Sequence, residues 1–314
     1  MGTLTIKKVA AAGINGSLGP TLIPHLIAAN FALTILTRCR QATLDAWPNN
    51  SFASIIEVDY TSPETLTTAL HGQDALISLI SRLDAPASNT LHDAATAASV
   101  PRIIPSCFGG NHRLSSVREN PALGPKLEME EHIEKLAAQG LITYTGIHQG
   151  ALLDWALLRG LFVNTKGPTA VFNGGDVPFS ATLLDDLAKA VVNALRKPEE
   201  TENRYLYVHS AVVTQNQLLA LCKEVMPDKE FPRIELDSQI LFDQSWEAYN
   251  RGERGYDAMR GFLAHMTFGQ RLGLFEEVDN ELLGVEELSQ DALREVVRSV
   301  MGQILEKNLP PFWT

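Results

Sequence analysis

The sequence is poor in cysteine, in positive charge and in long hydrophobic runs. Its 314 residues include three cysteines, Cys39, Cys107 and Cys222, and none belongs to a Cys-x-x-Cys pair. The eight histidines also lack metal-ligand spacing, so we expect neither a disulfide framework nor a bound metal. No hydrophobic run approaches transmembrane length and no signal peptide is visible, which predicts a cytoplasmic protein.

The balance of charge argues against two kinds of partner. The 26 basic residues are outnumbered by 37 acidic ones, for a formal net charge of −11. Such a chain is repelled by the phosphates of nucleic acids and by anionic membrane surfaces. We therefore expect a small-molecule partner, and a protein that is a monomer or a homodimer.

Glycines near the N-terminus form the most informative motif. A hydrophobic strand pattern over residues 4–12 leads into Gly13-Ile14-Asn15-Gly16-Ser17-Leu18-Gly19, and a helical pattern follows at once. Gly13 would allow a sharp turn, Gly16 the close approach of a pyrophosphate, and Gly19 tight packing of the new helix, whose N-terminus favours an anion. The loop residues Asn15, Ser17 and Leu18 would then border the cofactor. The alternative is a glycine-rich turn without a ligand.

The second strand pattern, over residues 32–37, ends in arginine where dinucleotide-binding proteins often carry an acidic residue. Arg38 and Arg40 follow this strand directly. A guanidinium favours the 2′-phosphate of NADPH, so we predict NADPH/NADP⁺ as the cofactor, held by Arg38. The alternative for Arg38 is a solvated surface arginine.

Strand and helix patterns alternate through the first half of the chain. This alternation predicts a doubly wound parallel α/β sheet of the Rossmann type. The expected strands are residues 4–12, 32–37, 54–59, 75–80, 102–106 and 142–147, and the expected helices are 18–30, 62–71, 88–99, 125–139 and 150–161.

The alternation fades near residue 150. We expect residues 1–150 to form a nucleotide-binding domain and residues 151–314 a smaller C-terminal α/β substrate lobe. Segments near 180–197 and 205–232 are expected to return to the first domain, and residues 239–275 to be irregular and rich in aromatic side chains.

In such sheets the ligands bind beyond the carboxyl ends of the strands. That rule selects the polar and glycine-rich residues that follow each strand as cofactor or substrate contacts. They are Asp59, Ser78, Ser81, Ser106, Cys107, Phe108, Gly109, His148 and Gln149.

Lys126 is the predicted proton donor. It follows Gly124-Pro125, which is typical of a helix start, where the positive field and apolar surroundings would lower its pKa and suit it to proton exchange with a substrate oxygen. The alternative is a solvated lysine on an exposed helix.

These features together resemble the isoflavone-reductase-like and NmrA-like group of atypical short-chain dehydrogenases/reductases. The likeness rests on the glycine triplet, Arg38, the run Pro105-Ser106-Cys107-Phe108-Gly109, and Lys126 eight residues before Glu134. Residues 184–188 are similar to the second-lobe signature of that family, and residues 278–284 to its fungal members. The resemblance implies NADPH, a Rossmann domain with a small substrate lobe, and hydride transfer to a phenolic or other aromatic secondary metabolite, with Lys126 as the catalytic lysine.

Three departures from the family pattern leave alternatives open. Cys107 stands where the family has glutamate, and a buried inert thiol competes with a reactive one. His148 follows the last expected strand, either as an added acid/base or substrate donor or as a structural histidine. No Tyr-x-x-x-Lys pair occurs, so the tyrosine mechanism of typical short-chain dehydrogenases is not available.

The aromatic stretch supplies the last predicted contacts. Trp246 and Tyr249 would line a pocket for a planar substrate, with plain core packing as the alternative. Two other functions compete with the reductase, namely a non-catalytic NADP(H)-sensing regulator and an NADP-binding enzyme of a redox-neutral step. Lys126 favours an enzyme, because a sensor needs no proton donor.

Overall fold

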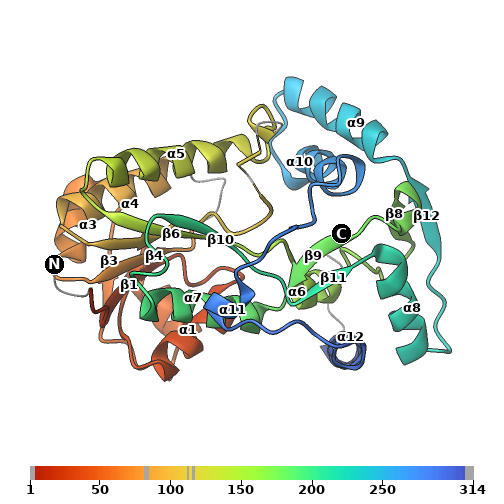
Figure 1. Ribbon diagram of the computed structural model, residues 1–314, viewed down its shortest axis with the longest axis horizontal. Coiled ribbons are helices and arrows are strands. Elements are labelled where there is room, and N and C mark those ends of the chain that lie inside the picture. Colours follow the sequence, from red (N-terminus) through yellow and green to blue (C-terminus); the bar gives the residue numbers. More distant parts are fainter. Residues whose placement is uncertain (1–3, 81–84, 112, 115–116, 308–314) are drawn as a thin grey trace.

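A seven-stranded parallel sheet organises the larger lobe (Figure 1). The computed structural model describes residues 4–80, 85–111, 113–114 and 117–307. The strand order is β10-β6-β5-β4-β1-β2-β3, and every neighbouring pair is parallel. The strands are β1 (Lys8–Ala12), β2 (Ala32–Thr37), β3 (Ser54–Glu57), β4 (Ala75–Ser78), β5 (Arg102–Ile104), β6 (Thr143–His148) and β10 (Arg204–Tyr207). The order reverses between β1 and β4, which places the ligand crevice at their carboxyl ends.

Helices cover both faces of this sheet, because its strands are hydrophobic on both sides. On β1, Val9 and Ala11 face one core, whereas Ala10 and Ala12 face the other. The helices on the first face are α1 (Gly19–Ala28), α7 (Leu184–Arg196) and α11 (Asn280–Leu283). Those on the second face are α3 (Pro63–Leu70), α4 (Ala85–Ala97) and α5 (Gly124–Ala138). The predicted doubly wound Rossmann sheet is confirmed.

The smaller lobe combines two small sheets with five helices. Its strands are β7 (Ala151–Leu152), β9 (Phe179–Thr182) and β11 (Ala211–Val213) in one sheet, and β8 (Thr169–Phe172) with β12 (Arg233–Leu236) in the other. Its helices are α6 (Leu153–Leu158), α8 (Gln215–Val225), α9 (Ser238–Asn250), α10 (Tyr256–Ala264) and α12 (Gln290–Lys307). Within residues 180–197 and 205–232, α7 packs on the large sheet and β10 pairs in it, whereas β9, β11 and α8 contribute to the core of the small sheets.

Several element boundaries differ from the prediction. The stretch 239–275 is not irregular, since α9, α10 and the π-helical turn η4 (His265–Gly269) occupy most of it. Asp237 starts α9 by accepting a hydrogen bond from the backbone N–H of Gln239 at 2.7 Å, a capping signal that the aromatic content obscured. The helix expected over 150–161 is preceded by β7 and ends at Leu158. The helix α2 (Arg40–Ala46) was not predicted, and a short 3₁₀ turn, η3 (Asn173–Gly175), follows β8 directly.

A buried arginine fastens the sheet to the connection between α7 and β10. Arg102, at the start of β5, is 1% exposed. Its guanidinium donates to the hydroxyl oxygens of Thr143, Thr145 and Thr201 and to the carbonyl oxygen of Pro198, at 2.6–3.2 Å. Burial lowers its pKa to about 10, so it stays charged and its role is structural.

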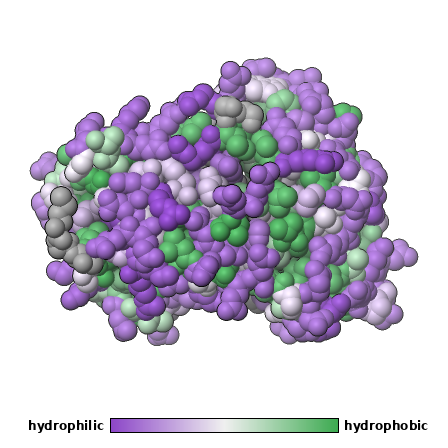
Figure 2. Space-filling view, viewed as in Figure 1, coloured by the Kyte–Doolittle hydropathy of each residue, from purple (hydrophilic) through white to green (hydrophobic). Residues whose placement is uncertain are grey.

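Hydrophilic residues cover most of the face shown in Figure 2, and hydrophobic residues reach it in small separate patches. Among the described residues, no helix is both long enough and apolar enough to cross a membrane.

Candidate functional site

The turn between β1 and α1 has glycine where no other residue fits. Gly13 has φ of +82°, and a Cβ there would lie 2.8 Å from the backbone of Leu79. A Cβ on Gly19 would lie 1.7 Å from the carbonyl oxygen of Ile14. The backbone N–H of Gly16 donates to the carbonyl oxygen of Gly13 at 3.1 Å. This tight turn brings the N-terminus of α1 to the carboxyl end of β1, where backbone N–H groups are available to an anion.

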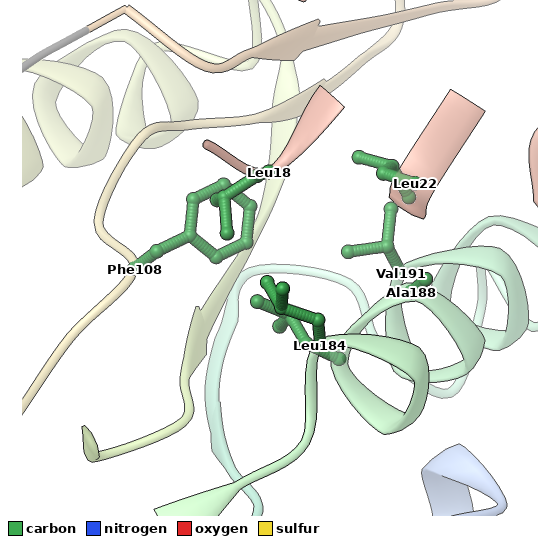
Figure 3. A pocket seen from close by; sticks show the side chains of 7 residues that line it. Leu18, Leu22, Phe108, Leu184, Ala188 and Val191 are labelled. Carbon is green, nitrogen blue, oxygen red and sulfur yellow. The ribbon is translucent and has the colours of Figure 1, made fainter. Parts of the chain in front are cut away.

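The other predicted loop residues have distinct surroundings. Asn15 accepts a hydrogen bond from the indole N–H of Trp47 at 3.0 Å, so its side chain joins the glycine turn to α2. Ser17 is exposed. Leu18 lies beside the Phe108 ring in a small apolar recess, with Leu184 of α7 pointing toward both (Figure 3). The recess therefore lies between the glycine turn and the loop after β5.

A cavity of about 500 Å³ opens at the carboxyl ends of β2 and β3. Its lining consists of Arg38, Glu57, Val58, Asp59, Tyr60, Thr61 and Ala87. The volume lies within the range of small-molecule sites, roughly 300–1,000 Å³. Arg38 is exposed here and has no ion-pair partner among the residues described, so its guanidinium is available to a phosphate.

The two carboxylates in this cavity are already engaged. Asp59 accepts from the backbone N–H and the hydroxyl of Thr61 at 2.8 and 2.7 Å, and these hydrogen bonds lower its pKa. Glu57 accepts from the backbone N–H of Arg40 at 2.8 Å. Glu57 was not predicted, since it lies inside the expected strand 54–59, whereas the observed strand β3 ends at this residue.

Ser78 lies at the carboxyl end of β4, next to the point where the strand order reverses. It is fully buried, and its hydroxyl has no hydrogen-bond partner within the described ranges. A buried polar group of this kind calls for a partner, and a bound cofactor would supply one. Ser106 is half-buried after β5. Ser81 lies outside the described residues.

Three side chains hold the loop that follows β5. Lys126, half-buried in the first turn of α5, donates from Nζ to the carbonyl oxygen of Phe108. Gln149 accepts from the backbone N–H of Gly109 at 2.8 Å, and His148 donates from Nδ1 to the carbonyl oxygen of Gly110 at 2.8 Å. The loop after β5, the start of α5 and the end of β6 therefore meet at one place, which brings Lys126, His148 and Gln149 together.

His148 positions this loop. Its side chain is 0% exposed, and burial lowers its pKa to about 3, so the ring is neutral at ordinary pH. Because Nδ1 donates to a carbonyl oxygen, the lone pair lies on Nε2. The ring also stacks on Tyr207 at 5.1 Å between centroids. Of the two alternatives for His148, this geometry matches the structural histidine.

Cys107 is a buried thiol. It is 0% exposed, and burial raises its pKa to about 12, so the unreactive protonated form predominates. Its Sγ donates weakly to the carbonyl oxygen of Ile147 at 3.8 Å. These surroundings match the inert alternative.

Glu130 is the member of this region that sequence reasoning missed. It is fully buried on α5, with Oε1 3.7 Å from Nε2 of His148 and Oε2 3.7 Å from the Arg113 guanidinium. Burial raises its pKa to about 8, opposed by Arg113 and Lys126. A signal did exist, because Glu130 stands three residues from both Leu127 and Ile133, on the buried stripe of the helix.

Trp246 and Tyr249 lie on α9, in an aromatic cluster between α9 and α10. Trp246 contacts Phe262 edge-on at 5.1 Å and Tyr249 at 5.8 Å, and both predicted residues are half-buried. The cluster includes Ala122, just before α5, so the helix pair rests on the segment that leads to Lys126. The ring contacts described for Trp246 and Tyr249 are with this cluster, and their contact with a substrate stays a prediction.

Comparison with known proteins confirms the resemblance. The model of the NmrA-like family matches residues 5–244. A curated relative, "Oxidoreductase poxI" of Penicillium oxalicum, is 29% identical over 309 residues, which cover 94% of each chain.

Two solved structures share the fold at low identity. The complex of leucoanthocyanidin reductase with NADPH from Vitis vinifera aligns with a TM-score of 0.75 and 16% identity, over 95% of this chain and 99% of that one. The structure "AtPrR2 with NADP+ and (+)pinoresinol" aligns with a TM-score of 0.70 and 16% identity, over 94% and 99%.

Proposed function

The chain belongs to the NmrA-like family, and from this premise we propose that it is an NADPH-dependent reductase of aromatic secondary metabolites. The observation that carries the proposal is the convergence of two features at one sheet edge. A nucleotide-sized cavity with an available arginine lies beside the glycine turn, and the loop held by Lys126 lies at the far end of the same edge.

The residues present fit NADPH. The glycine turn would hold the pyrophosphate at the N-terminus of α1, and Arg38 would hold the 2′-phosphate in the 500 Å³ cavity. The buried hydroxyl of Ser78 would gain its missing hydrogen bond near the middle of the cofactor. The relative named oxidoreductase and the neighbours solved with NADPH or NADP+ support the same cofactor.

When bound, NADPH supplies a hydride from C4 of its nicotinamide. Reduction of an enone, a quinone or a benzylic centre also requires a proton, which Lys126 would donate from Nζ to the substrate oxygen. The hydrogen bond from Lys126 to the Phe108 carbonyl holds this ammonium beside the loop until a substrate competes for it. The apolar recess at Leu18 and Phe108 would exclude water from that side.

The proposal is tested by replacing Lys126 and a matched control. Candidate quinones, enones and anthrones are incubated with the protein while the absorbance of NADPH is followed. Lys126→Ala should lower kcat by about 10²–10⁴-fold and leave NADPH affinity near normal, because the lysine acts on the substrate oxygen. Lys135→Ala, in the last turn of the same helix, should leave both unchanged.

Full activity of Lys126→Ala would overturn the role of the lysine. Tight NADPH binding without oxidation by any candidate would instead favour the sensing regulator or the redox-neutral enzyme.

A further inference from the structure

Beneath the loop after β5, three buried side chains of different chemistry face one another. They are Cys107 from the loop, Glu130 from α5 and His148 from the end of β6, and each is fully buried. One ligating atom from each lies within 4.8 Å of the other two, and Nε2 of His148 lies 3.7 Å from Oε1 of Glu130. A thiolate, a carboxylate and an imidazole are the donors that zinc selects in proteins.

The spacing is close to what such an ion requires. Zinc bonds of about 2.0–2.3 Å at tetrahedral angles place neighbouring ligand atoms roughly 3.3–3.8 Å apart. A nitrogen and an oxygen ligand fall at the lower end of that range, about 3.3–3.5 Å, and the 3.7 Å between His148 and Glu130 is within a few tenths of an ångström of it. The Cys107 sulfur lies within 4.8 Å of both of these atoms, so a small inward shift would complete three ligands.

The orientation of the histidine is a second, independent feature of a ligand site. Its Nδ1–H donates to the carbonyl oxygen of Gly110 at 2.8 Å, which leaves the lone pair of Nε2 directed at Glu130. Metal-bound histidines are held in this way, with the other ring nitrogen donating to a backbone carbonyl or a carboxylate. Stacking on Tyr207 fixes the plane of the ring.

Charge both favours and limits the binding of a cation here. One thiolate and one carboxylate neutralise a divalent ion, so the loaded centre would bury no net charge. Arg113, 3.7 Å from Glu130, and Lys126, on the Phe108 carbonyl, already bring positive charge to the same region. These cations compete with a metal, and we expect weaker binding than at a four-ligand structural zinc site.

We propose that Cys107, Glu130 and His148 form a three-ligand site for a zinc-like divalent ion. The sequence shows no short-spacing metal motif here, because Cys107 and Glu130 are 23 positions apart and Glu130 and His148 are 18 positions apart. The three ligands meet only through the packing of α5 on β5 and β6. The inference does not depend on the reductase activity.

Cobalt(II) is the probe, because it occupies zinc sites and reports them by colour. The full chain with Cys39→Ser, which removes the exposed thiol, is freed of metal with a chelator and titrated with Co²⁺. We expect one equivalent to produce a thiolate-to-cobalt charge-transfer band with the visible bands of tetrahedral cobalt, and Zn²⁺ to abolish both.

Added variants separate the ligands from the rest of the chain. Cys107→Ser should remove the charge-transfer band, and Glu130→Gln and His148→Gln should each weaken Co²⁺ binding at least tenfold. Cys222→Ser is the matched control, since this other buried cysteine lies in the second lobe, and it should bind Co²⁺ as the parent does.

Two results would overturn the site. They are a folded parent protein that shows no thiolate band at millimolar Co²⁺, and a band that persists in Cys107→Ser. Circular dichroism checks that each variant is folded, and the near-isosteric Glu130→Gln still decides the question if Cys107→Ser is unfolded. Loss of reductase activity alone bears on neither result.

Discussion

Replacing Arg38 by alanine should convert the protein from a selective NADPH binder into one that hardly distinguishes NADPH from NADH. Arg38 lines the 500 Å³ cavity, is exposed, and has no ion-pair partner among the residues the structure describes. Its guanidinium is therefore the group available to a 2′-phosphate, which NADH lacks.

The exposure of Arg38 sets the expected loss of NADPH affinity. A hydrogen bond between charged groups contributes about 1.5–3 kcal/mol, and solvent screening at an exposed site reduces it to about 1–2 kcal/mol. At about 1.4 kcal/mol per tenfold, Arg38→Ala should weaken NADPH roughly 5- to 30-fold and change NADH affinity by less than about twofold. The NADPH effect should shrink at high salt.

Isothermal titration of both cofactors at low and high salt measures these differences. Arg40→Ala is the matched control, because Arg40 is also exposed after β2 but contacts Glu57 through its backbone N–H, which alanine keeps. Equal losses for NADPH and NADH in Arg38→Ala would refute the assignment, as would an equally large NADPH loss in Arg40→Ala.

Three further predictions concern the frame around the site. Gly19→Ala would bring a Cβ to 1.7 Å from a backbone oxygen. NADPH should therefore bind at least about tenfold weaker, and the free energy of unfolding should fall by about 1–3 kcal/mol. Near-normal values in titration and urea unfolding would contradict this prediction. Arg102→Leu removes four hydrogen bonds and should lower the free energy of unfolding, measured in urea, by at least about 3 kcal/mol. A decrease below about 1 kcal/mol would show that this network stabilises the fold little. In the native protein a disulfide reagent should modify the exposed Cys39 rapidly and should react with Cys107 and Cys222 only on unfolding. Cys107 and Cys222 are buried, and burial raises the pKa of each thiol to about 12. Rapid modification of two or more thiols would contradict the burial.

Much of the first lobe could be predicted because its signals are local. Each strand of the parallel sheet is a short hydrophobic run. Three of the helices also begin with a local signal, a proline in the first turn of α1 and α5 and Ser62 with Pro63 at α3. The positions of Gly13 and Gly19 in the turn after β1 could also be predicted, since only glycine accommodates the turn they form.

The second lobe was harder to predict for a physical reason. Its strands β9, β11 and β12 have three or four residues each, too few to establish a periodicity. The helices α9 and α10 are joined by a glycine- and arginine-rich turn and bury aromatic rings against each other, so their hydrophobic pattern resembled irregular packing.

The candidate site likewise has one part that local sequence signals predict and another part that they do not. Lys126 could be placed from a helix start and a family motif, whereas the environment of His148 depends on residues from three elements. This histidine donates to Gly110 from one ring nitrogen and faces Glu130 with the other, and both contacts are decided by packing between residues distant in sequence. Cys107, Glu130 and His148 come together only in the tertiary structure, so no metal-ligand spacing in the sequence indicates this cluster.

The proposed reaction transfers a hydride from NADPH to an aromatic acceptor while Lys126 supplies the proton. NADPH that carries deuterium at both C4 positions tests it most directly, with an enone or anthrone acceptor and analysis of the product by mass spectrometry and NMR. The account predicts one deuterium on the reduced carbon, a proton of solvent origin on the oxygen, and loss of the reaction in Lys126→Ala. Bound NADPH that keeps its deuterium with every acceptor, or deuterium transfer undiminished in Lys126→Ala, would contradict it.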